Sequence, residues 1–129
     1  MIDQSLLNQW ALLVLRIGVG VVFLVHGNAK RKFWQMQPSE QLPIQLLTIL
    51  RMLAIAEPIA GLAVMLGIFT RLASVGLCIV MLGAIRMKAL QMHKKLNDDG
   101  GWGYDFILLA SAIALVLSGP GQFAIWNVL

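Results

Sequence analysis

The chain has 129 residues, of which 59% are hydrophobic and only 12% are charged, and its formal net charge is +4 at pH 7. A water-soluble domain carries roughly 25% charged residues and could not bury this much apolar surface, so the composition excludes a soluble fold and favours the lipid bilayer as solvent. The single cysteine, Cys78, excludes an internal disulfide.

Four apolar segments follow one another along the chain, approximately over residues 10–26, 44–69, 72–90 and 104–118. Each is near the length of about 20 residues that a helix needs to cross ~30 Å of hydrocarbon. Their apolar residues run continuously, which favours helices over the alternating strands of a membrane barrel. The predicted fold class is therefore all-α, a polytopic membrane protein with a four-transmembrane-helix bundle that forms one domain over residues 1–129.

The first predicted helix carries a polar stripe. Residues spaced by three and four positions share one helical face, and the members of this stripe are Arg16, Gly20, Phe23, Gly27 and Lys30. Glycines allow a neighbouring helix to approach closely, so the stripe is expected to face the bundle. The alternative is that Arg16 snorkels to the outer interface.

His26 ends the first predicted helix. One interpretation makes it a proton carrier or a hydrogen-bond donor to a quinone-like carbonyl. The other makes it an interfacial histidine that bonds water or backbone. The only other histidine is His93, and no Cys/His cluster accompanies either one, so no metal site is predicted.

Glu57 lies near the middle of the second predicted helix and is followed by Pro58. A proline inside a helix removes a backbone donor and tends to kink the helix. A carboxyl group at this depth must be neutral or paired, because an unpaired charge is too costly in hydrocarbon. Glu57 is therefore predicted either as a functional carboxyl, a candidate proton carrier, or as the structural partner of Arg16.

The third and fourth predicted helices meet on one side of the membrane. Arg86 closes the third and Asp105 opens the fourth, and we expect an ion pair between them that holds these two helices together. A carboxylate is also favoured near a helix N-terminus by the helix dipole.

The basic residues indicate the orientation in the membrane. The first and third connections carry most of them, namely Lys30, Arg31, Lys32, Lys94 and Lys95. Basic residues stay on the cytoplasmic side, so both termini are expected on the outer side. Their membrane-flanking positions argue against nucleic-acid binding.

Three stretches of the sequence resemble the DoxX family of small membrane proteins. They are Arg16-Ile-Gly-Val-Gly-Val-Val-Phe-Leu-Val-His26-Gly27 followed by Lys30, then Ala56-Glu57-Pro58-Ile-Ala-Gly61-Leu leading to Leu66-Gly67-Ile-Phe-Thr70-Arg71, and finally Gly103-Tyr104-Asp105 continuing to Ser118-Gly119-Pro120-Gly121. The likeness covers nearly the whole chain. Two features depart from the family pattern: Asp105 stands where a glutamate is frequent, and Gln122 follows Gly-Pro-Gly where a serine and an aspartate are frequent.

The resemblance implies a four-helix bundle in the cytoplasmic (inner) membrane of a bacterium or archaeon. Relatives are linked to a terminal quinol oxidase and to a thiosulfate:quinone oxidoreductase. The recurrent polar positions of the family fall on buried or ligand-facing residues, which here are Arg16, His26, Lys30, Glu57, Thr70 and Arg71.

Together these observations predict an accessory membrane subunit of a quinone-linked redox or respiratory complex. Arg16 and Glu57 would form a buried polar centre, with His26 and Lys30 near a quinone headgroup. No motif for haem, an iron–sulfur cluster or a dinucleotide occurs, so no cofactor is expected to be bound covalently or by a motif; quinone is a candidate ligand, and any electrons would come from outside this chain. Two alternatives stay open: a non-catalytic structural or assembly subunit, and a small proton-coupled transporter. Whether the chain itself catalyses a reaction is left open.

Overall fold

The computed structural model describes residues 3–126 and contains four α-helices, which are α1 (Gln4–Ala29), α2 (Ile44–Leu66), α3 (Thr70–Arg86) and α4 (Gly103–Ser118). A short 3-10 helix, η1 (Lys30–Trp34), continues α1, and a π-helical turn, η2 (Met87–Gln91), continues α3. No strand occurs between residues 3 and 126. The predicted all-α class is confirmed.

The helix ends follow local capping chemistry. α1 begins at Gln4, earlier than predicted, because Asp3 accepts a hydrogen bond from the Ser5 amide and caps the helix. The Ser5 hydroxyl and amide together lower the pKa of Asp3, which keeps a negative charge at this N-terminus. α2 ends at Leu66 because Gly67 adopts a left-handed conformation with φ of 74°, a common way to terminate a helix.

Three of the helices are long and apolar enough to cross a membrane: α1 with η1, α2, and α3 with η2. α4 is apolar but has 16 residues, which rise only about 24 Å. That α4 also crosses the bilayer stays a prediction.

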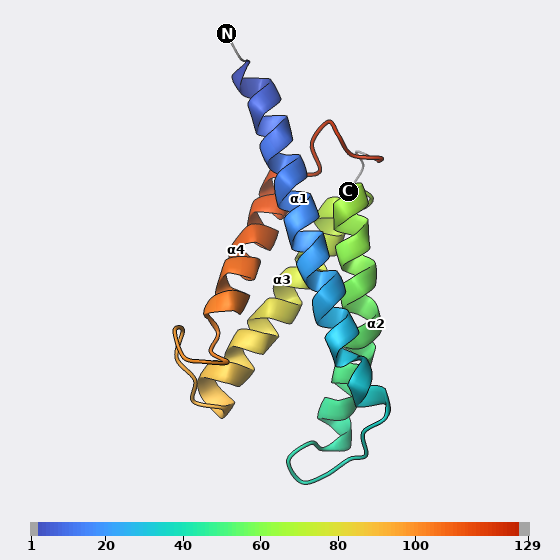
Figure 1. Ribbon diagram of the computed structural model, residues 1–129, viewed down its shortest axis with the longest axis vertical. Helices are drawn as coiled ribbons and strands as arrows, with labels where there is room; N and C mark the ends of the chain where they lie inside the picture. The colour runs from blue at the N-terminus through green and yellow to red at the C-terminus, as the bar shows by residue number, and fades with distance from the viewer. Residues whose placement is uncertain (1–2, 127–129) are drawn as a thin grey trace.

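The helices form two pairs (Figure 1). α1 packs along α2, and α3 packs along α4, with fewer contacts between the pairs. The pairs lie close at the end that holds the α2–α3 turn, which we call the turn end. They diverge toward the opposite end, called the η end because η1 and η2 lie there.

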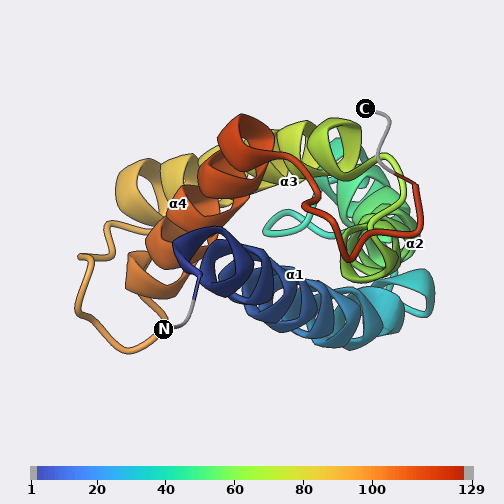
Figure 2. The ribbon, with the colours of Figure 1, turned by 90° about the horizontal axis from the view of Figure 1, so that it is seen from above.

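Residues 119–126 cover the turn end (Figure 2). They leave α4, cross the bundle and reach the end of α2, where the amides of Ile125 and Trp126 donate to the carbonyls of Leu66 and Gly67. The Trp126 ring packs on Phe69 with centroids 4.8 Å apart. This tail ties the two helix pairs together.

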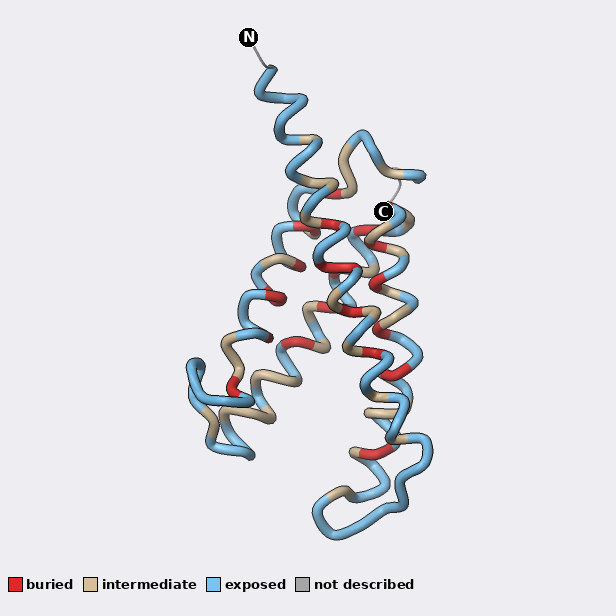
Figure 3. Tube along the Cα trace, in the orientation of Figure 1, coloured by how far each residue is buried: buried red, intermediate tan, exposed pale blue. Residues whose placement is uncertain are grey.

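The buried residues lie along the inner faces of the helices (Figure 3). The apolar core draws on all four helices and consists of Val19, Phe23, Val64, Leu77, Met81, Leu108, Leu109, Ala112 and Leu115. Outward-facing residues are apolar as well: Val14 is 69% exposed and Leu117 is 77% exposed. An apolar outer surface around an apolar core is what a bundle immersed in lipid requires.

Candidate functional site

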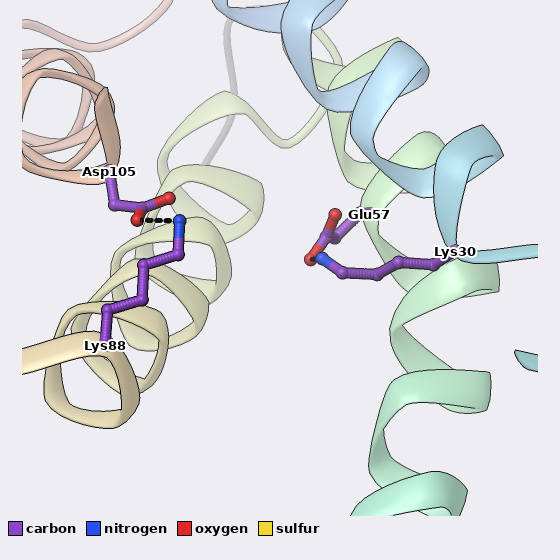
Figure 4. A network of polar contacts seen from close by, with 4 residues as sticks. All are labelled: Lys30, Glu57, Lys88 and Asp105. Carbon is purple, nitrogen blue, oxygen red and sulfur yellow. Dashed lines mark hydrogen bonds and ion pairs between the residues drawn. The ribbon is translucent and has the colours of Figure 1, made fainter. Parts of the chain in front are cut away.

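Two buried carboxylates lie at the η end, and each is paired with a lysine (Figure 4). Glu57 of α2 is 1% exposed and pairs with Lys30 of η1. Asp105 of α4 is 2% exposed, and the Lys88 Nζ of η2 lies 2.6 Å from its Oδ2 atom. Each helix pair therefore contributes one lysine–carboxylate pair, and the two face each other across the space between the helix pairs.

Helical phase explains why these lysines turn inward. The buried residues of α3 are Thr70, Ser74, Leu77 and Met81, spaced by three and four positions. Lys88 lies seven residues after Met81 and continues that stripe, two helical turns on. On the first helix, Lys30 continues the buried stripe in the same way, three residues after the buried Gly27.

His26 of α1 lies between the two pairs. Its ring is half-buried, His26 lies one helical turn before Lys30, and the ring is next to Tyr104, which directly precedes Asp105. The ring lies 5.3 Å from the Tyr104 ring of α4 and 6.1 Å from the Phe23 ring. An imidazole in this position can exchange a proton or donate a hydrogen bond beside either carboxylate.

Glu57 keeps one oxygen available. Its Oε1 atom accepts from Lys30, whereas its Oε2 atom is buried and has no hydrogen-bond partner among the described residues. A buried polar atom without a partner is costly and is usually satisfied by a ligand, a water or a proton. The second oxygen of Glu57 therefore indicates a place for a further polar group.

An apolar cleft of about 400 Å³ opens beside this cluster, between α2 and α3. Its α2 wall includes Leu46, Leu50 and Leu53, and its α3 wall includes Val80 and Gly83. The polar residues at its border are Lys30, Arg86 and Gln91. Because Lys30 borders the cleft and also pairs with Glu57, the polar cluster and the apolar cleft are adjacent.

The predicted polar centre of Arg16 and Glu57 is wrong. Arg16 is buried, but its guanidinium donates to the carbonyls of Val64 (3.1 Å), Met65 (2.9 Å) and Pro120 (3.0 Å) at the turn end. It lies ten residues before His26 on α1, which is a rise of about 15 Å. The last carbonyls of a helix lack helical partners, and a guanidinium with five donors satisfies several of them at once.

The predicted ion pair between Arg86 and Asp105 is also wrong. Arg86 is exposed because its position falls off the buried stripe of α3, and Lys88 takes its place beside Asp105. Sequence reasoning missed Lys88 as a site residue, although the seven-residue spacing from Met81 could have identified it.

The remaining predicted site residues lie at the turn end. Thr70 is fully buried at the start of α3, and its hydroxyl has no hydrogen-bond partner among the described residues. Arg71 is exposed, with its guanidinium beside Gly119. The structure therefore brings His26, Lys30 and Glu57 together and leaves Arg16, Thr70 and Arg71 outside the cluster.

Comparisons with known proteins identify one matching family and two similar proteins. The DoxX family profile matches residues 11–93. The chain is 34% identical over 128 residues to the "Uncharacterized membrane protein Rv3486" of Mycobacterium tuberculosis, covering 89% of this chain and 78% of that protein. It is 33% identical over 116 residues to the "Putative oxidoreductase CatD" of Bacillus subtilis, covering 88% of this chain and 82% of that protein. No solved structure matches the chain significantly.

Proposed function

Because the chain belongs to the DoxX family of membrane proteins, we propose that it binds a quinone headgroup between its two helix pairs, as an accessory membrane subunit of a redox complex. The observation that carries this proposal is the cluster at the η end, where two buried lysine–carboxylate pairs lie with His26 near them and Lys30 also borders an apolar cleft. The name of the Bacillus subtilis relative, a putative oxidoreductase, supports a redox role.

The residues at the η end fit such a ligand. A quinone presents carbonyl acceptors on a flat ring and carries an apolar tail. His26 and Lys30 supply donors for the carbonyls, and the leucines of the cleft offer an apolar surface for the tail. The Oε2 atom of Glu57, which has no partner among the described residues, accepts a hydrogen bond from a reduced ring.

A quinone exchanges electrons and protons, and this chain contributes side chains that exchange protons with it. Glu57 and Asp105 are each buried and paired with a lysine. His26 lies in the same cluster and exchanges a proton with the bound quinone. Electrons are exchanged with a partner subunit.

The test fills the cleft without touching the polar cluster. A Cβ added at Gly83 meets no atom within 4 Å, and Gly83 lines the cleft. We expect Gly83→Phe to leave the fold intact and to weaken binding of a short-tailed quinone analogue by about tenfold or more, since the ring occupies the tail site. Binding is measured by quenching of tryptophan fluorescence in mild detergent.

Gly76→Phe is the matched control. It makes the same change seven residues earlier on α3, also meets no atom within 4 Å, and lies outside the cleft. It should bind the analogue as the unaltered protein does. Absence of saturable binding to the unaltered protein, or equal affinity in the two variants, would contradict the proposal.

A proton-coupled transporter is the second candidate, favoured by the buried unpartnered oxygen of Glu57. It predicts pH-dependent uptake of a solute into proteoliposomes that Glu57→Gln abolishes. Quinone-analogue binding with no such uptake supports the redox subunit instead.

A further inference from the structure

A second cavity, of about 660 Å³, lies where η1 meets α2. Its α2 wall includes Ala54 and Ile55. Ile55 is two helical positions from Leu53 of the apolar cleft, so the two side chains point to nearly opposite sides of α2. This cavity, which we call the η1 pocket, is therefore separate from the proposed quinone site.

The η1 pocket is basic. Its lining includes Arg31 and Lys32 and contains no acidic residue. Within residues 3–126 the ion pairs are Lys30–Glu57 and Lys88–Asp105, so neither cation of the η1 pocket is neutralised by a described carboxylate. Within the described part of the chain, the one side-chain hydrogen-bond partner of Arg31 is the amide oxygen of Asn28, at 3.3 Å, and the Lys32 ammonium lies 5.5 Å from the centre of the Phe33 ring. The pocket thus offers an anion two positive charges that no described carboxylate neutralises.

Contacts between Arg51 and η1 hold the wall of the pocket in place. Arg51 of α2 donates to the carbonyls of Phe33 (2.9 Å) and Met36 (2.8 Å) and lies 5.8 Å from the centre of the Trp34 ring. These contacts hold η1 against α2 and fix the position of Trp34 in the pocket wall. A tryptophan beside basic residues is typical of the depth at which lipid headgroups lie.

An apolar groove of about 530 Å³ continues from the η1 pocket along the outer face of α2. The two share Ile55, and the groove extends to Ala63 of α2 and to Phe69 and Leu72 of α3. From Ile55 to Ala63 the helix rises about 12 Å, close to half of the ~30 Å hydrocarbon thickness. A charged pocket thus joins an apolar channel about one leaflet deep.

We propose that the η1 pocket and this groove bind one molecule of an anionic phospholipid. The phosphate group lies against Arg31 and Lys32, and an acyl chain lies along the groove. Charge selects the occupant, because two unpaired cations without a carboxylate favour an anionic headgroup over a zwitterionic one. The continuous groove favours a lipid over a free anion, because a free phosphate has no acyl chain to bury in the groove.

The test is native mass spectrometry of the full chain released from detergent with equal amounts of phosphatidylglycerol and phosphatidylcholine of identical acyl chains. We expect one phosphatidylglycerol per chain, preferred over phosphatidylcholine by roughly tenfold or more, as two cations near a lipid surface predict. Glycerol phosphate, which has the headgroup charge but no chains, should not compete. Equal binding of the two lipids, or competition by glycerol phosphate, would contradict the proposal.

Two variants locate the site. The double variant R31Q/K32Q should lose the preference for phosphatidylglycerol. The matched double variant K94Q/K95Q removes two adjacent lysines from the other basic connection and should keep it. An equal loss in both would show that overall charge, not the η1 pocket, attracts the lipid. The same spectra reveal the other possible occupant: a dimer that carries no lipid would place a second copy of the chain in the groove and overturn the proposal.

Discussion

At the scale of single residues, Lys88 should contribute more to the stability of the fold than the nearby Arg86, because Lys88 pairs with a buried carboxylate and Arg86 is exposed. Lys88→Gln leaves the Asp105 carboxylate buried without its cation, and a buried polar group that loses its partner costs about 1–3 kcal/mol. We expect a clearly lower thermal unfolding midpoint in detergent for Lys88→Gln. Arg86→Gln, the same kind of change at an exposed position, should leave the midpoint nearly unchanged.

A second substitution shows whether the charge pair is the cause. In the double variant Lys88→Gln with Asp105→Asn, both partners are neutral and can hydrogen-bond each other, so most of the lost stability should return. If Lys88→Gln proves as mild as Arg86→Gln, Asp105 has another partner and the assignment of Lys88 to the site is wrong.

Which residues are buried was readable from the sequence, but which ones pair was not. The spacing of the stripe predicted that Arg16 turns inward, and it does. Its partners are backbone carbonyls at the end of α2 and in the tail, which no sequence pattern identifies. Glu57 was expected to need a partner, and Lys30 of η1 supplies it. The sequence could not identify this partner, because the position of one helix along the other is set by their packing contacts and not by composition.

At the scale of helices, α1 and α2 approach closely through facing glycines. A Cβ built on Gly20 would lie 2.6 Å from the carbonyl oxygen of Gly61, too close for any side chain. Gly20→Val should therefore push the two helices apart and cost about 1–3 kcal/mol. Gly18→Val, the same change two residues earlier, meets no atom within 4 Å and should be nearly neutral.

The thermal unfolding midpoints of the two glycine variants in one detergent provide the comparison. Both carry the same cost of placing valine in a helix, so a difference between them measures the contact alone. Equal midpoints would mean that α1 and α2 do not cross at Gly20 and Gly61.

The elements themselves were largely predictable. Continuous apolar runs predicted the positions of all four helices. The helix ends differ where local chemistry decides, as at the Asp3 cap of α1 and the left-handed Gly67 after α2. The divergence of the two helix pairs, which creates the cleft, could not be predicted because it depends on side-chain packing across all four helices.

At the scale of the whole molecule, the two helix pairs are held together at one end and open at the other. The turn end is fixed by the tail and by Arg16, whose guanidinium links α1 to the end of α2 and to Pro120. The η end has two ion pairs, each within its own helix pair, and the contact between the His26 and Tyr104 rings joins the two helix pairs there.

The restraint at the turn end can be tested with one conservative substitution. Lysine keeps the charge of Arg16 but has no planar fork, so Arg16→Lys cannot hold three carbonyls at once. Each lost hydrogen bond to a charged group removes roughly 1.5–3 kcal/mol, so the tail should open more often. We expect the amides of Ile125 and Trp126, which donate to Leu66 and Gly67, to exchange hydrogen about tenfold faster or more.

Arg86→Lys is the control, because Arg86 is exposed and is the last residue of α3, directly before η2 at the η end. Hydrogen exchange followed by mass spectrometry in one detergent should show faster exchange over residues 119–126 for Arg16→Lys alone. If protection of the tail is the same in both variants, the backbone hydrogen bonds and the Trp126–Phe69 contact hold the turn end without Arg16. The buried guanidinium would then serve only the end of α2, and the two helix pairs would owe their connection to the tail itself.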